Sequence, residues 1–97
     1  MIFRIVQMTF RADAVEEFTT LFEARKQNIR NFEGCSHLEL WQDNTNTRIF
    51  FTYSIWESQA TLDHYRFSDF FKDTWGRTKA LFAAKPQAWS VMQRHVL

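Results

Sequence analysis

Two side chains in the second half of the chain have the chemistry for proton transfer or charge stabilisation. His64 is a candidate general base, because imidazole titrates close to neutral pH. Arg77 is a permanent cation and a candidate partner for an oxyanion that develops on a bound substrate. Each has a simpler alternative, since His and Arg on a helix usually face solvent. We treat both as catalytic candidates for a reaction in which a substrate loses a proton.

Three aromatic residues are candidates for enclosing such a substrate. Trp56 ends a strand-like segment, and its indole N–H is a possible catalytic donor to a substrate oxygen. Phe71 and Trp75 follow each other one helical turn apart and are candidates for the opposite, substrate-binding wall. The alternative for all three is burial in the core, because an apolar stripe at helical spacing is typical of packing.

The sequence gives little support to nucleophilic, metal or phosphate chemistry. Cys35 is the single cysteine, and without polar partners nearby we expect it to be a small buried residue. The three histidines share no ligand spacing, so we expect no metal site and no cofactor. With only two glycines, the chain also has no glycine-rich loop for phosphate.

The periodicity of the apolar residues predicts strands and helices in a definite order. Strands are predicted over residues 2–10, 35–42, 48–57 and 87–96, and helical segments over 13–33 and 58–85. The third strand carries large residues on both faces, so we expect it to be central and covered on both sides.

Capping residues predict where the helices begin and end. Asp13 with Glu16 resembles a capping box, and Gly34 is a natural stop for the first helix. Ser58 is the predicted cap of the second helix, and Ser68 predicts a break near Phe67. The sequence Lys85-Pro86 is expected to end that helix.

Composition limits the class of protein. Ninety-seven residues predict one domain over residues 1–97, with 45% hydrophobic residues and a net charge of +1. The near-neutral charge, without a basic run, argues against nucleic acid and against a charged membrane surface as partners. We expect a cytoplasmic protein, since neither a signal peptide pattern nor an apolar stretch of transmembrane length is present.

The element order β-α-β-β-α-β predicts an α+β, ferredoxin-like fold. In this fold two helices cover one face of a four-stranded antiparallel sheet. The other face would here carry several large apolar residues, and a monomer rarely leaves such a patch in water. We therefore predict a homodimer in which the open sheet faces pack together and close a barrel-like core.

Several segments resemble the antibiotic biosynthesis monooxygenase domain family. They are Glu33-Gly34-Cys35, a strand that ends in Trp41-Gln42-Asp43, and Trp56-Glu57-Ser58 followed by Leu62 and Ser68. The resemblance covers nearly the whole chain and implies the dimeric α+β barrel fold. It also implies a pocket between sheet and helices, with Thr52 and Trp56 on the pocket side.

The family includes cofactor-independent monooxygenases of polyketide-type aromatics, quinol monooxygenases and haem-degrading enzymes. Members often carry a His early in the second helix; here Tyr65 stands at that position and His64 is one place away. Tyr65 is therefore a catalytic candidate that donates to a ketone or phenolate. Thr52 replaces an Asn of the polyketide-oxidising branch, and Trp75 replaces the His of the haem-degrading branch, which argues against haem degradation.

Two functions remain open from the sequence. The first is a cofactor-independent monooxygenase acting on a small aromatic, quinol or polyketide-type substrate, which must first become an electron-rich anion. The second is a non-catalytic homodimer that binds a hydrophobic small molecule, which the missing His pair favours. RNA recognition, which also uses a βαββαβ module, is disfavoured because its glycines and basic residues are missing.

Overall fold

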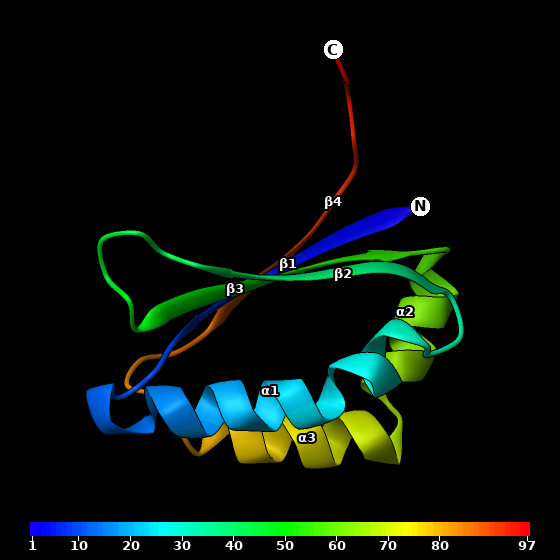
Figure 1. Cartoon of the computed structure of the whole chain (residues 1–97). Coiled ribbons are helices and arrows are strands. Elements are labelled where there is room, and N and C mark those ends of the chain that lie inside the picture. Colours follow the sequence, from blue (N-terminus) through cyan, green and yellow to red (C-terminus); the bar gives the residue numbers. More distant parts are fainter.

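The computed structural model describes all of residues 1–97 and shows helices on one face of a four-stranded antiparallel sheet (Figure 1). The sheet order is β2-β3-β1-β4, which confirms the predicted ferredoxin-like α+β fold. The elements in chain order are β1 (Ile2–Thr9), the 3₁₀ turn η1 (Ala12–Ala14), α1 (Val15–Arg30), β2 (Cys35–Gln42), β3 (Ile49–Trp56), α2 (Gln59–Arg66), α3 (Asp69–Lys79) and β4 (Gln87–Val91).

Strand β3 is central, as its two apolar faces predict. It pairs with β1 over its whole length and with β2 on its other edge. Thr52 lies opposite Val6 of β1 and Leu40 of β2, so it stands in the middle of the sheet. Because side chains alternate along a strand, Thr52 shares the helix-facing side with buried Phe50, Ser54 and Trp56.

The start of α1 differs from the prediction. Asp13 does not cap the helix with Glu16; it lies in η1, and its carboxylate accepts from Arg11 at 3.3 Å. No side chain caps the first turn of α1. The predicted box was wrong because the chain bends through a 3₁₀ turn before the α-helix begins. Gly34 does adopt a left-handed conformation, with φ of 88°, and β2 begins directly after it.

The second helical segment breaks where its caps predict. Ser58 caps α2 and forms a reciprocal capping box with Thr61. Phe67 ends α2, and the hydroxyl of Ser68 accepts from the Phe71 N–H at 3.1 Å to begin α3. The break turns α3 so that it runs beside α1 under the sheet (Figure 1).

Helix α3 ends at Lys79, well before Pro86, so the predicted helix end was wrong. Tertiary hydrogen bonds take over from the helical ones. The Arg11 N–H donates to the Leu81 carbonyl at 3.0 Å, and the Ala83 N–H donates to the Thr9 carbonyl at 2.8 Å. Strand β4 is also shorter than predicted, and residues 92–97 extend beyond the sheet (Figure 1).

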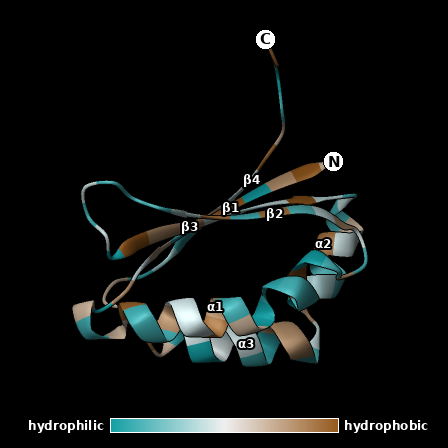
Figure 2. Ribbon diagram, in the orientation of Figure 1, coloured by the Kyte–Doolittle hydropathy of each residue, from teal (hydrophilic) through white to brown (hydrophobic).

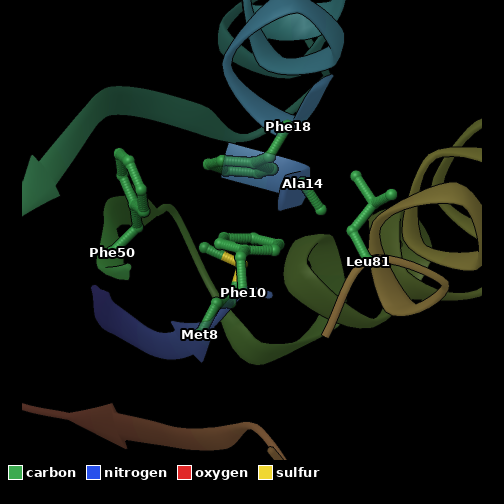
Figure 3. Close-up of a cluster of buried hydrophobic side chains, with 6 residues drawn as sticks. All are labelled: Met8, Phe10, Ala14, Phe18, Phe50 and Leu81. Carbon is green, nitrogen blue, oxygen red and sulfur yellow. The ribbon is translucent and has the colours of Figure 1, made fainter. Parts of the chain in front are cut away.

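The apolar core consists of two clusters under the sheet. The first contains Met8, Phe10, Ala14, Phe18, Phe50 and Leu81. In it the rings of Phe10 and Phe18 lie face to face with centroids 4.0 Å apart, as Figure 3 shows. The second contains Ile29, Cys35, Trp56, Leu62 and Tyr65. Phe22 of α1 packs against both clusters.

The face of the sheet away from the helices is uncovered and rich in large apolar residues. Figure 2 shows hydrophobic segments along β1 and β3. Trp41 of β2 and Trp89 of β4 are 40% and 43% exposed on this face, and Trp41 stacks on Tyr53 with centroids 5.1 Å apart. None of the helices is both long and apolar enough to cross a lipid bilayer.

Candidate functional site

A cavity of about 260 Å³ lies between the sheet and the helices. Its walls combine residues of both core clusters with residues of all three α-helices. The lining residues are Arg4, Val6, Met8, Phe18, Phe22, Ile29, Leu38, Thr52, Ser54, Trp56, Leu62, Tyr65, Arg66, Phe71, Thr74, Trp75, Thr78 and Ala88. The cavity is therefore mostly apolar, with a small number of polar groups, as is common for small-molecule sites.

Five of the seven residues predicted for the site line this cavity: Thr52, Trp56, Tyr65, Phe71 and Trp75. The four aromatic rings form a continuous row of neighbouring contacts. Trp56 and Tyr65 are parallel at 4.7 Å, Tyr65 meets Phe71 edge-on at 5.0 Å, and Phe71 and Trp75 are parallel at 5.9 Å. Strand β3, α2 and α3 together hold this wall.

Tyr65 lines the cavity, and its side chain is largely buried. No hydrogen bond joins its hydroxyl to another group of the chain. Because no fully buried polar side-chain atom lacks a partner, the hydroxyl oxygen keeps some access to the open space beside it. Burial raises the pKa of Tyr65 well above its usual value, with a smaller coulombic contribution from Cys35 in its thiolate form. The phenol therefore stays protonated, and it is available as a donor to a bound molecule. The Thr52 hydroxyl likewise lines the cavity without a protein partner.

Trp56 is nearly inaccessible, at 1% exposure, and its indole N–H donates to the Ser54 hydroxyl at 2.9 Å. The N–H thus already has a partner, which agrees with the interpretation of Trp56 as a core residue whose ring lines the cavity. Because Ser54 uses an oxygen lone pair for the indole, its own proton remains free to donate. Ser54 also lines the cavity.

Two predicted catalytic residues lie elsewhere. His64 is exposed on α2, packs beside Phe32 at 5.7 Å, and lines a separate, open groove between α1 and α2. Arg77 is exposed on α3 and pairs with Asp73 at 3.1 Å, one turn away. Neither lines the cavity, so the structure does not bring them together with the aromatic wall. The positive charge of Arg77, which suggested a catalytic role, instead forms a surface ion pair.

Two cations that the sequence analysis missed do line the cavity: Arg4 of β1 and Arg66 at the end of α2. Arg4 lies on the helix-facing side of β1, between the apolar neighbours Ile2 and Val6, and donates to the Ser90 hydroxyl at 2.9 Å. Burial, with a smaller contribution from the charge of Arg66, lowers the pKa of Arg4. A cation in an otherwise apolar strand face was the available signal for Arg4.

The lining contains no carboxylate, imidazole, thiol or amine side chain. Its hydrogen-bonding side-chain groups are hydroxyls, guanidiniums and the indole N–H groups of Trp56 and Trp75. The structure also brings no three His, Cys, Asp or Glu side chains together in a group that could hold a metal ion. The cavity can therefore donate hydrogen bonds and stabilise negative charge, but within one chain it offers no side chain that readily accepts a proton.

Comparison with known proteins identifies the family. The family model "Antibiotic biosynthesis monooxygenase" matches residues 1–76, and the chain belongs to this family. No curated protein is similar enough to count as a relative.

Solved structures show the same fold at low identity. A structure described as an antibiotic biosynthesis monooxygenase is 17% identical, with a TM-score of 0.91 over 98% of this chain and 100% of that chain. A conserved protein from Methanosarcina mazei Go1 is 20% identical, with a TM-score of 0.89 over 97% and 94%. Rv0793 from Mycobacterium tuberculosis is 17% identical, with a TM-score of 0.87 over 98% and 96%.

Proposed function

We propose that this chain is a cofactor-independent monooxygenase that acts on a small aromatic, quinol or polyketide-type molecule in the cavity between sheet and helices. The observation that carries the proposal is the aromatic wall beside hydroxyl donors without protein partners, above all Tyr65. Family membership supports the reaction class.

The volume of the cavity narrows the substrate. A cavity of about 150 Å³ is enough for benzene, and sites for drug-sized ligands begin at about 300 Å³. At about 260 Å³ this cavity suits one or two fused rings better than a larger polycyclic molecule.

The chemistry needs a substrate that can become an anion, because ground-state dioxygen accepts single electrons. A deprotonated quinol or methylene-ketone gives one electron to O₂, and the resulting radical pair joins as a carbon-bound peroxide. Loss of water then leaves one oxygen atom on the carbon as a carbonyl. Two C–H bonds of the methylene-ketone, or one O–H and one C–H bond of the quinol, break. The O–O bond breaks, and the two oxygen atoms end in a C=O group and in water. The substrate supplies all four electrons that reduce O₂.

The residues of the cavity would promote the first step by stabilising the anion rather than by removing the proton. The Tyr65 and Thr52 hydroxyl groups can donate to the phenolate or enolate oxygen, and the arginines add positive charge. Such donors lower the pKa of a bound phenol or enol, so that the proton can leave to water. The aromatic rings hold the substrate plane and exclude bulk water.

We also propose that two chains associate through the uncovered sheet face. The exposed Trp41 and Trp89 side chains and the half-buried Tyr53 on that face support this proposal, because an apolar patch of this kind is usually covered by a partner.

A second candidate function is a homodimer that binds a hydrophobic small molecule without transforming it. The absence of a proton-accepting side chain from the lining favours this alternative. The two functions predict the same ligand and differ only in oxygen consumption.

The test is oxygen uptake by metal-free protein with a panel of one- and two-ring hydroquinones. The proposal expects one O₂ consumed per substrate and, with ¹⁸O₂, one labelled atom in the product. Turnover that disappears on chelation would contradict a cofactor-independent reaction. Saturable binding of the panel without oxygen uptake would establish the binder instead.

A further inference from the structure

We infer that the cavity takes an anionic aromatic molecule, with one or two rings against the aromatic wall and a carboxylate held by Arg4 and Arg66. The inference deepens the proposed function by naming the charge of its ligand. It concerns binding, and it can be tested without any oxidation.

The first argument is the charge balance of the cavity. Arg4 and Arg66 are the only charged residues in the lining, and both are positive. Neither forms a salt bridge, whereas Arg11, Arg25 and Arg77 each pair with an aspartate. The two cations have no counterion and repel each other, and half-buried Arg4 has also lost part of its hydration, so a bound anion would relieve both costs.

The second argument is the position of Arg4 within the sheet. Its Cα lies opposite Ser54 of β3 and opposite Ser90 of β4. Ser90 accepts one of its N–H groups at 2.9 Å, which fixes the side chain along the sheet. The guanidinium has five N–H donors, so several remain for a ligand, and its planar fork suits a carboxylate.

The third argument is the supply of neutral donors beside the cations. The Ser54 hydroxyl accepts a hydrogen bond from the Trp56 indole, so its own proton remains free to donate. Ser54 lies on β3 directly opposite Arg4. Thr74 accepts from Arg25 at 2.7 Å, which leaves its proton free in the same way. With Tyr65, the cavity thus has donors and cations for an anion, and no carboxylate that would repel one.

The experiment measures, at neutral pH, the binding of two probes that cannot be oxidised at the site: 2-naphthoate and 2-naphthamide. They have the same two rings and differ in charge. By isothermal titration calorimetry at low ionic strength, 2-naphthoate should bind about tenfold or more tightly than 2-naphthamide. Equal affinity for the two, or no binding of 2-naphthoate, would overturn the inference.

Substitutions locate the effect. Arg4→Gln should weaken 2-naphthoate about tenfold and change 2-naphthamide less than about twofold, because only the charge-assisted hydrogen bonds are lost. Arg66→Gln, at an exposed helix end, should weaken 2-naphthoate by a smaller factor. Arg48→Gln is the matched control, since Arg48 is exposed and lies outside the cavity. An equal loss in Arg48→Gln would show that net charge alone acts, and would overturn the inference.

Two further readouts keep the test decisive. Circular dichroism checks that each variant is folded. If Arg4→Gln is unfolded, the inference is judged from the affinities of Arg66→Gln and from the ratio of the two probes' affinities for the unaltered chain. Oxygen uptake is measured separately with the hydroquinone panel. Arg4-dependent binding of 2-naphthoate without oxygen uptake would sustain the anion site while contradicting the monooxygenase.

Discussion

Tyr65 shows how burial and a missing partner together define a role for one side chain. Its ring stacks on Trp56 and therefore contributes to the core, whereas its hydroxyl makes no hydrogen bond to another group of the chain. The hydroxyl is therefore available to water or to a bound ligand. Packing and function can thus be separated on this one residue.

Replacing Tyr65 by Phe should test that separation. The Tyr65→Phe variant keeps the ring stack, so its free energy of unfolding should change by less than about 1 kcal/mol. Its kcat/KM for an oxidised substrate of the panel should fall about a hundredfold, the usual effect of losing one donor to a developing oxyanion. Steady-state oxygen uptake and urea unfolding measure the two quantities.

Tyr53→Phe is the matched control, because Tyr53 lies on the opposite face of the sheet and outside the cavity lining. Its kcat/KM should equal that of the unaltered chain. Equal activity of Tyr65→Phe and Tyr53→Phe would show that the Tyr65 hydroxyl has no catalytic part.

Asp73 connects helices α1 and α3 through charge. Its carboxylate accepts from Arg77 at 3.1 Å and lies 3.0 Å from Arg25 of α1. The hydrogen bond from Arg77 and then that from Arg25 lower the pKa of Asp73. A carboxyl group with a lowered pKa in the folded state stabilises the fold above its unfolded pKa, and this contribution is lost as pH falls through the folded pKa.

The Asp73→Asn variant should therefore be slightly less stable than the unaltered chain at pH 7, with a small difference because the pair is exposed to solvent. The difference should shrink as pH falls below the usual aspartate pKa of 3.8 and vanish once pH is below the lowered pKa of Asp73 in the folded state. Urea unfolding midpoints at several pH values measure this. A gap that stays constant with pH would contradict the ionic origin.

At the scale of the elements, the connection between α1 and β2 depends on one glycine. Gly34 has φ of 88°, a conformation that costs an L-residue about 1–2 kcal/mol. Its Cα also faces Thr61, the residue that completes the capping box of α2, and a Cβ at position 34 would overlap with that side chain. Gly34 thus connects the turn between α1 and β2 with the first turn of α2.

Gly34→Ala should lower the free energy of unfolding by about 2 kcal/mol or more, from the backbone conformation and the overlap together. Gly76→Ala is its control within the same chain. Gly76 lies in α3 with nothing near its missing Cβ, so alanine there should stabilise the fold by up to about 1 kcal/mol. Opposite shifts in urea midpoint are the expected result; two shifts of the same sign would contradict it.

The elements were largely predictable from the sequence because local signals agree with the final fold. The alternation of apolar residues divided the side chains of β1 and β3 into two faces each, and the two serine caps predicted the starts of α2 and α3. The helix ends that were predicted wrongly are determined by contacts between residues distant in sequence. Helix α3 stops where Leu81 and Ala83 bond to the segment after β1, and no pattern around Pro86 contains that information.

The site was predictable only in part, for a related reason. Period-two alternation puts Thr52 and Trp56 on one face of β3, and helical spacing puts Trp75 on the apolar stripe of α3. Only the resemblance to the family implied that this face of β3 is the one toward the helices, where the cavity lies. These patterns cannot show which polar residue reaches the cavity. His64 and Tyr65 are adjacent on α2, yet one is exposed and the other lines the cavity, a difference of about 100° of rotation around the helix. Arg4 was overlooked because charge on a strand is usually taken to face solvent.

At the scale of the molecule, the two faces of the sheet have different tasks. The helix side contains both core clusters and the cavity, and the other side carries exposed aromatic rings that the fold itself leaves uncovered. Residues 92–97 extend from β4 on the side away from the helices (Figure 1). They add exposed Met92, Val96 and Leu97 to the uncovered apolar surface of the chain.

A charge in the centre of the uncovered face should separate the proposed dimer. The unaltered chain should sediment as two chains at micromolar concentration, whereas Tyr53→Asp should sediment as one, because a carboxylate would be buried without a partner. Thr20→Asp, on the exposed surface of α1, adds the same charge elsewhere and should remain dimeric. A single-chain mass for the unaltered protein would contradict the proposal.

The division of the core into two clusters has a consequence for how this protein can change. One core cluster surrounds Phe10 and the other surrounds Trp56. The cavity lies between them and is lined by members of both clusters. Exchanging a residue that only borders the cavity removes few packed atoms, so its folding cost is small. Substitutions in the cavity lining can therefore change which ligand binds while the rest of both core clusters stays packed.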